Sequence, residues 1–381
     1  MNRWIWTYWQ EESVMRKFAL LAMFAVMLAL IPAAGAQDAT PVSVVLKWVP
    51  QAQFAGYYAA EALGYYDNEG LDVTIIPAGV DINPQQLLAS GEAQFIVDWM
   101  GNALSTKATG ADLINIAQIY QRSGMRQITW ADSGLTSFDQ LGDKVVGVWC
   151  CGNQFPTFAA LTQAGFDVPD MEANGLIAQQ AFDMNAFLAR EIDAASAMTY
   201  NELAQVLEVV AEDGTFPVNT LDMLNVLDFN ENGTAMLEDG LYARSEWLAE
   251  DGNEEVAIKF LRATFLGWAH CRDNPSDCVD YVLAAGPTLG VGHQAWMMNE
   301  VNKLVWPSEA GVGILDAAAY DTTHQIALDF GVISEAIDAA DMYRTDLAQA
   351  ALDSLATDMA DADLVGADYA PAEVAVTANG E

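Results

Sequence analysis

Short apolar runs alternate with amphipathic stretches along the chain from residue 42 to about residue 230. Apolar runs bounded by Gly, Pro, Asn or Asp predict strands, and apolar positions with helical spacing predict helices. The predicted strands are residues 42–46, 71–76, 93–97, 113–118, 127–130, 144–149, 194–198 and 223–228, and the predicted helices between them include 83–89, 104–108, 155–164 and 200–210. This alternation predicts an α/β fold with mostly parallel sheets.

The pattern becomes almost wholly helical after about Arg244. Helices are predicted at residues 253–268, 278–285, 293–304, 317–329 and 346–355. We expect these helices to cover the sheets rather than to build another one. Residues 359–381 are rich in Ala and Asp, with few large apolar residues, and predict a loosely ordered acidic tail.

Two segments are suited to carry the chain between two lobes, one at residues 122–124 and one at residues 230–239. Two crossings predict a discontinuous first lobe, residues 42–122 plus 240–355, and a continuous second lobe, residues 125–235. A ligand cleft is expected between the lobes, because small-molecule sites commonly lie at such interfaces.

The first 36 residues predict a signal peptide. Arg16 and Lys17 precede a 15-residue apolar run, residues 18–32, and Ala34-Gly35-Ala36 supplies small residues for cleavage. The run is short for a membrane span of about 20 residues, which favours a cleaved signal over a retained anchor. We therefore expect an exported protein, periplasmic or extracellular, whose start is Met1 or Met15.

Charge and motifs exclude several functions. The chain has 15 Lys and Arg against 53 Asp and Glu, a net charge of −38, so it lacks the basic footprint that nucleic acid requires. It has three His and no HExxH or CxxC spacing, so no metal site is predicted. Cys271 and Cys278 flank a polar turn that contains Pro275, and in an oxidising compartment they predict a disulfide.

The first candidate cluster follows the first predicted strand and holds Trp48, Gln51, Gln53, Tyr57 and Tyr58. Flat rings stack on planar ligands, and amides can read a polar edge. The alternative is that the two tyrosines are core residues of an amphipathic helix, which we favour for Tyr58. The loop with Trp48 and the two glutamines favours a site.

A second cluster follows the strand at residues 93–97 and contains Asp98, Trp99 and Asn102. Asp98 is placed either to accept a hydrogen bond from a ligand or to cap the next helix. Arg122 lies in the first predicted crossing, where it would pair with an acid at the hinge or hold an anionic group of a ligand.

A third cluster, after the strand at residues 144–149, contains Trp149, Gly152, Asn153 and Gln154. Backbone N–H groups at the start of the following helix would point into the cleft, unless this is an ordinary turn. Cys150 and Cys151 would be a vicinal disulfide, free thiols lining the pocket or packing residues, and the sequence leaves all three open.

A fourth cluster, Thr199-Tyr200-Asn201-Glu202, follows the strand at residues 194–198, and Tyr200 and Glu202 are its candidate site residues. A carboxylate there would accept hydrogen bonds from an aminopyrimidine-like edge, or it would complement the dipole of a helix N-terminus.

Four segments carry a resemblance to a known family: WVPQAQFAGYYAAEALGYYDNEGLDV, INPQQLLASGEAQFIVDW, VGVWCCGNQFP and MTYNE. Over residues 42–355 the chain resembles the periplasmic-binding-protein superfamily, in its NMT1/THI5-like (SsuA/THI5) branch. The resemblance implies the type II binding-protein fold and a solute-binding protein that delivers its ligand to the membrane permease of an ABC importer. It also implies a monomer without a cofactor. Ligands in this branch include thiamine pyrimidine precursors, riboflavin and alkylsulfonates.

The aromatic and amide residues fit a small heteroaromatic ligand better than a sulfonate, with riboflavin- or pyrimidine-type members the most similar. The branch also contains pyrimidine synthases, which use pyridoxal phosphate and an intrinsic His with iron. This chain has an export signal and no His before His270, which argues against that activity.

Overall fold

Two five-stranded sheets organise the computed structural model, which describes residues 39–381. The predicted signal peptide, residues 1–36, lies outside the described residues. The first sheet has the order β2-β1-β3-β10-β4 and consists of β1 (Thr40–Val45), β2 (Leu71–Ile76), β3 (Phe95–Asp98), β4 (Ile114–Gln118) and β10 (Gly240–Ala243). Strand β10 runs antiparallel to β3 and β4, whereas β1 is parallel to both its neighbours, in a register that pairs Thr40 with Leu71.

The second sheet has the order β7-β6-β8-β5-β9. It consists of β5 (Met125–Trp130), β6 (Val146–Val148), β7 (Ile177–Gln179), β8 (Ala194–Met198) and β9 (Leu224–Asp228). Strand β5 is antiparallel to both its neighbours, and β6 is parallel to β7 and β8. The predicted α/β fold with two sheets is confirmed, and both sheets are mixed rather than mostly parallel, because β10 and β5 run antiparallel to their neighbours.

All eight predicted strands are present, but two strands were missed. Strand β7 has only three residues, none of them buried, and lies at a sheet edge, so no apolar pattern marks it. Strand β10 reads Gly-Leu-Tyr-Ala, without β-branched residues, and its extended form depends on pairing with β3 and β4.

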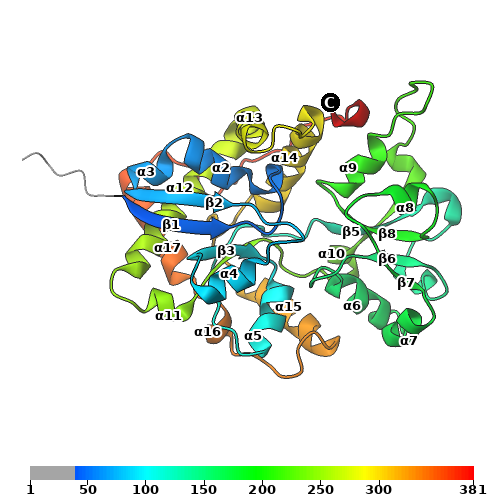
Figure 1. The fold of residues 1–381 in the computed structure, drawn as a ribbon, viewed down its shortest axis with the longest axis horizontal. Coiled ribbons are helices and arrows are strands. Elements are labelled where there is room, and N and C mark those ends of the chain that lie inside the picture. Colours follow the sequence, from blue (N-terminus) through cyan, green and yellow to red (C-terminus); the bar gives the residue numbers. More distant parts are fainter. Residues whose placement is uncertain (1–38) are drawn as a thin grey trace, which may run out of the picture. The chain divides into compact units, whose positions relative to one another are not determined.

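Helices lie on both sides of the first sheet (Figure 1). Those connected to this sheet are η1 (Ala52–Phe54), α2 (Ala55–Ala62), α3 (Tyr65–Asn68), α4 (Pro84–Ser90), α5 (Met100–Ala108), α11 (Ser245–Leu248), α12 (Asn253–Asp273), α13 (Pro275–Ala285), α14 (Val291–Val305), α15 (Ala317–Asp329), α16 (Ala339–Met342) and α17 (Asp346–Asp358). Those within the second sheet's stretch of chain are η2 (Ala131–Ser133), η3 (Phe138–Gln140), α6 (Phe155–Gln163), α7 (Val168–Ala173), α8 (Asn185–Leu188), α9 (Glu202–Leu207), η4 (Leu221–Met223) and α10 (Phe229–Asn232). Across the part of the chain that the structure describes, no helix is both long and apolar enough to cross a membrane.

Helices α2 and α12 approach each other through glycines. A Cβ on Gly267 would lie 2.0 Å from the carbonyl oxygen of Gly56, and a Cβ on Gly56 would lie 2.3 Å from the Trp268 ring. Only glycine permits this close crossing. The contact fixes α2, and with it the loop before α2 that carries Gln51 and Gln53.

The chain leaves the first sheet after Gln118 and returns to it at Gly240, and both crossings meet at Glu238. The Glu238 carboxylate is buried and accepts hydrogen bonds from Ser123 Oγ at 2.6 Å, Gly124 N–H at 3.0 Å and Met125 N–H at 3.1 Å. One acidic side chain therefore ties the two crossing segments together.

The C-terminal residues, predicted to be loosely ordered, are held by specific contacts. The carbonyl groups of Leu364 and Val365 accept hydrogen bonds from Val312 and Ser308, and Asn379 N–H donates to the Glu208 carbonyl at 2.9 Å. The only helical turn in this stretch is η5 (Ala378–Gly380). Backbone pairing of this kind leaves no apolar pattern in the sequence.

Candidate ligand-binding site

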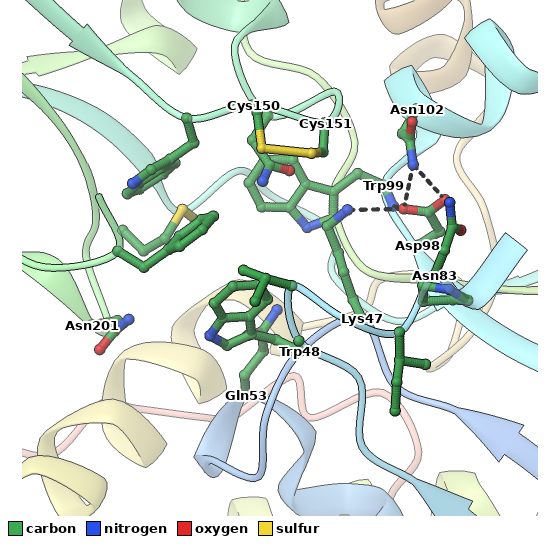
Figure 2. Close-up of a pocket in the computed structure, with 18 of the residues that line it drawn as sticks. Lys47, Trp48, Gln53, Asn83, Asp98, Trp99, Asn102, Cys150, Cys151 and Asn201 are labelled. Atoms are coloured by element: carbon green, nitrogen blue, oxygen red, sulfur yellow. Dashed lines mark hydrogen bonds and ion pairs between the residues drawn. A yellow bond between two sulfur atoms is a disulfide. The ribbon is translucent and has the colours of Figure 1, made fainter. Parts of the chain in front are cut away.

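A cavity of about 660 Å³ lies where the carboxyl ends of strands from both sheets meet (Figure 2). Its wall is formed by the segments that follow β1, β2, β3, β6, β7 and β8. The lining residues are Lys47, Trp48, Gln51, Gln53, Gly79, Val80, Ile82, Asn83, Pro84, Gln85, Asp98, Trp99, Asn102, Trp149, Cys150, Cys151, Asn153, Gln179, Phe182, Met198, Tyr200, Asn201 and Glu202. This is the position at which open α/β sheets bind ligands.

Ten of the predicted site residues line this cavity: Trp48, Gln51, Gln53, Asp98, Trp99, Asn102, Trp149, Asn153, Tyr200 and Glu202. They come from all four sequence clusters. Their contact with a ligand stays a prediction.

Four predicted site residues do not line the cavity. Tyr57 is buried in the core, with its ring edge-on to Trp268 at 6.0 Å between centroids, and burial raises its pKa well above the usual tyrosine value. Gly152 and Gln154 form a turn in which Gly152 N–H donates to Gln154 Oε1. The structure therefore gives these three residues packing and turn contacts.

Arg122 also lies away from the cavity. Its guanidinium donates to the carbonyl groups of Leu304, Trp306 and Pro307, the shortest of these contacts being 2.8 Å, to Pro307. Backbone carbonyls, rather than an acid or a ligand anion, are its partners. It holds the first crossing against the end of α14.

The sequence reasoning missed lining residues of two kinds. Lys47 and the loop of Gly79–Gln85 line the cavity and lie within or beside the segments that resemble the family. Their residue types and spacing predicted no role in ligand binding. Gln179 ends β7 and Phe182 follows it, and because this strand has no apolar pattern, nothing in the sequence placed the two residues near a cleft.

Asp98 forms the charged corner of the cavity. Its carboxylate accepts hydrogen bonds from Lys47 Nζ at 2.9 Å, Gln85 Nε2 at 2.6 Å, Asn102 Nδ2 at 2.8 Å and its neighbour's N–H, that of Trp99, at 2.8 Å. The Lys47 ammonium also lies 5.1 Å from the centroid of the Trp99 ring. Asp98 is thus a lining residue whose charge is already paired, and it does not cap α5, whose N-cap is Trp99.

Asp239 lies directly behind the wall of the cavity. It accepts hydrogen bonds from Gln53 Nε2 and Trp99 Nε1, both at 2.7 Å, while Gln51 Nε2 donates to Gln53 Oε1. Burial raises the Asp239 pKa to about 6, against the lowering effect of the Gln53 hydrogen bond. This buried acid fixes the orientation of an indole and an amide that face the cavity.

Three aromatic rings from the two lobes form an apolar wall. The rings of Trp48 and Phe182 lie 4.4 Å apart between centroids, tilted by 50°. Those of Trp149 and Phe182 are within 17° of parallel, with centroids 6.5 Å apart. Cys150 and Cys151, joined as a vicinal disulfide, line the cavity as well (Figure 2). Such flat faces suit a planar ligand.

Glu202 supplies an acceptor on the second lobe. It is buried, and its carboxylate accepts hydrogen bonds from Met198 N–H at 3.0 Å and Asn201 Nδ2 at 2.7 Å. Burial raises its pKa to about 7. A carboxyl group in this state can accept hydrogen bonds from ligand N–H groups or, when protonated, donate one.

The two sheets, the crossings and the cavity at the strand ends define the periplasmic-binding-protein fold. The chain belongs to the NMT1/THI5-like family, whose model matches residues 51–278. A riboflavin-binding protein, RibY, from Chloroflexus aurantiacus is 25% identical over 326 residues, which cover 82% of this chain and 88% of that protein. A formylaminopyrimidine-binding protein from Halalkalibacterium halodurans is 23% identical over 245 residues, 64% of this chain and 69% of that protein.

Solved structures agree on the fold. The periplasmic aliphatic sulphonate binding protein SsuA from Escherichia coli superposes with a TM-score of 0.59 at 13% identity, covering 80% of this chain and 92% of SsuA. At that identity the likeness concerns the fold alone.

Proposed function

We propose that this protein is the exported solute-binding protein of an ABC importer, and that it captures a planar nitrogenous heterocycle between its lobes. The observation that carries the proposal is the wall of Trp48, Trp149 and Phe182, which faces polar side chains from both lobes. Stacking holds a flat ring, and amide and carboxylate groups read its nitrogen- and oxygen-bearing edge.

Riboflavin is the ligand that the cavity supports best. A volume of about 660 Å³ lies within the range of sites for drug-sized ligands, roughly 300–1,000 Å³, and suits a three-ring flavin with its side chain. A single pyrimidine ring would leave much of this space to water, so a formylaminopyrimidine-type ligand is the second candidate. The names of the two relatives support the same two ligand classes.

Binding would favour the state in which the lobes enclose the ligand, and the closed protein would then dock on the permease. We propose that the protein acts as a monomer outside the cytoplasmic membrane, associated with the membrane through its transporter. A signal peptide at residues 1–36 belongs to the same proposal.

Three lining tryptophans, Trp48, Trp99 and Trp149, provide a direct test. Titration with riboflavin should quench the protein's tryptophan fluorescence and saturate at one ligand per chain, with an aminopyrimidine binding more weakly. Native mass spectrometry of the purified protein should show a co-purified heterocycle. If neither compound class binds while ethanesulfonate does, the proposal is wrong.

The pyrimidine-synthase alternative has a separate test. Its family-implied chemistry needs a histidine, and among the described residues that line the cavity there is none, which favours capture over synthesis. Lys47 is the lysine that lines the cavity, and it is paired with Asp98. We expect pyridoxal phosphate to give no Schiff-base absorbance, and a band that is lost in Lys47→Met would support the synthase.

A further inference from the structure

Among the described residues that line the cavity, none offers an unpaired cation to an anionic ligand. Lys47 is the basic residue among the lining residues that the structure describes, and its ammonium lies 2.9 Å from the Asp98 carboxylate. His293 faces Asn201 from outside the cavity, and its other ring nitrogen contacts Glu208. Each of these groups is already paired with an acid of the protein.

Side chains of the protein also occupy four backbone N–H groups near the cavity. Asp98 accepts from Trp99 N–H before α5, and Asn83 Oδ1 accepts from Gln85 N–H at the start of α4. Gln154 Oε1 accepts from Gly152 N–H before α6. Glu202 accepts from Met198 N–H beside α9. Backbone N–H groups at helix starts are the usual anion ligands, and of these four the one at the start of α4 is capped by a side chain, that of Asn83.

The remaining ionisable groups are acidic. Glu202 lines the cavity, and Asp239 lies behind Gln53 and Trp99, in hydrogen bonds to both. Asp98 adds a third carboxylate, which Lys47 balances. A phosphate or sulfonate in this cavity would therefore lose its hydration, meet no unpaired donor cation and lie near like charge, all of which is unfavourable.

We infer that the site selects against anions: it takes the unphosphorylated heterocycle and rejects the corresponding phosphate ester and alkylsulfonates. This inference rests on the proposed function for the heterocycle, but its electrostatic part does not depend on which heterocycle binds. It also implies that a phosphomonoester-hydrolysing reaction must precede capture wherever the available form of the ligand is phosphorylated.

The test compares riboflavin with riboflavin 5′-phosphate by isothermal titration calorimetry at pH 8. We expect the phosphate ester to bind about tenfold or more weakly, because like-charge proximity costs free energy. Equal or tighter binding of the ester overturns the inference and leaves the proposed function intact. A second arm titrates inorganic phosphate and ethanesulfonate at millimolar concentrations, with tryptophan fluorescence and thermal unfolding as readouts.

The second arm decides the question even if riboflavin does not bind. Absence of any saturable response to both anions supports the inference, and a saturable response overturns it. Glu202→Gln removes a lining charge with little change of shape and should narrow the ratio between riboflavin and its phosphate ester. Glu172→Gln makes the same charge change on the exposed surface of α7 and should leave the ratio unchanged. If both variants behave alike, the discrimination does not arise from the cavity's charge.

Discussion

His293 Nδ1 lies 2.9 Å from both carboxylate oxygens of Glu208, and His293 Nε2 lies 3.0 Å from Asn201 Oδ1. His293 is in α14, which packs on η1 of the first lobe, whereas Asn201 and Glu208 flank α9 of the second lobe. Asn201 also lines the cavity. One imidazole therefore links the two lobes at the edge of the candidate site.

The C-terminal residues reinforce this link. Asn379 N–H donates to the Glu208 carbonyl, and Gly380 is buried close to His293. A Cβ on Gly290 would lie 2.3 Å from the Gly380 carbonyl oxygen, so the tail lies directly on the start of α14. The tail thus contacts both lobes beside the imidazole.

We predict that His293→Ala weakens ligand binding about fivefold or more by favouring the open arrangement of the lobes, since a lost interlobe contact shifts that equilibrium. Small-angle X-ray scattering of the ligand-free variant should give a larger radius of gyration than the wild type. A double-mutant cycle that combines His293→Ala with Glu208→Gln should give an interaction free energy of about 1 kcal/mol between the two residues.

His270→Ala is the matched control, because the His270 ring contacts Asn274 and Asp277 within the first lobe. It should change neither the scattering nor the affinity. An unchanged radius of gyration in His293→Ala, together with additive effects in the cycle, would show that the contact does not govern closure.

We predict that Trp48→Ala and Phe182→Ala each weaken heterocycle binding by about tenfold or more. Each removes a ring face from the aromatic wall, and stacking contributes about 0.5–1.5 kcal/mol beyond the apolar area that is lost. Calorimetry measures the change in affinity. Trp247→Phe, at a ring that packs on Phe95 in the first lobe, should bind like the wild type. Wild-type affinity in both alanine variants would remove the aromatic wall from the binding mechanism.

Strand ends were the part of the site that the sequence could predict. In a parallel α/β sheet the residues just after each strand gather at one edge, so Trp48, Asp98, Trp149 and Tyr200 were placed together without any long-range information. Phe182 was missed because its strand is three residues long and has no buried residue. The prediction of each site residue therefore depended on recognising the strand before it. It failed at β7, because that strand has no apolar pattern.

The sequence could not predict which side chains of a helix or loop point into the core and which point into the cavity. Tyr57 and Gln53 are close in the chain, yet one packs on Trp268 in the core and the other lines the cavity. The close crossing of α2 and α12 decides which face of α2 is buried, and this depends on residues more than 200 positions away. Asp239 was missed for a related reason, because it acts from behind Gln53 and Trp99.

We predict that the stability of the folded protein depends on pH through Glu238, which lies where the two crossings meet. Burial raises its pKa to about 7, in spite of the hydrogen bonds from Ser123, Gly124 and Met125. The folded state therefore holds the proton more tightly than the unfolded state, whose carboxyl has a pKa near 4.5. The resulting stabilisation is fully present below pH 4.5 and is lost as the pH rises through about 7.

For Glu238 alone the contribution is about 3 kcal/mol between these limits, and Glu202 and Asp239 act in the same direction. The free energy of unfolding in urea should differ less between pH 5 and pH 8 in Glu238→Gln than in the wild type. Glu172→Gln, exposed on α7, should keep the wild-type difference. A wild-type pH difference in Glu238→Gln would mean that Glu238 does not carry this linkage.

The Cys271–Cys278 disulfide closes a short loop between the end of α12 and the start of α13. Replacing both residues with alanine should lower the free energy of unfolding by about 2.5 kcal/mol, from the regained entropy of the unfolded chain. Loss of two buried sulfur atoms adds to this, because both residues are fully buried. Equilibrium unfolding in urea measures the change.

The vicinal pair Cys150 and Cys151 is the matched comparison for that prediction. Adjacent residues enclose no loop, so the entropic argument gives little stabilisation, and the double alanine variant should unfold close to the wild type. Because both cysteines line the cavity, we expect their replacement to change the ligand's affinity rather than the protein's stability. Equal losses of stability in the two double variants would mean that loop closure is not what the Cys271–Cys278 bond contributes.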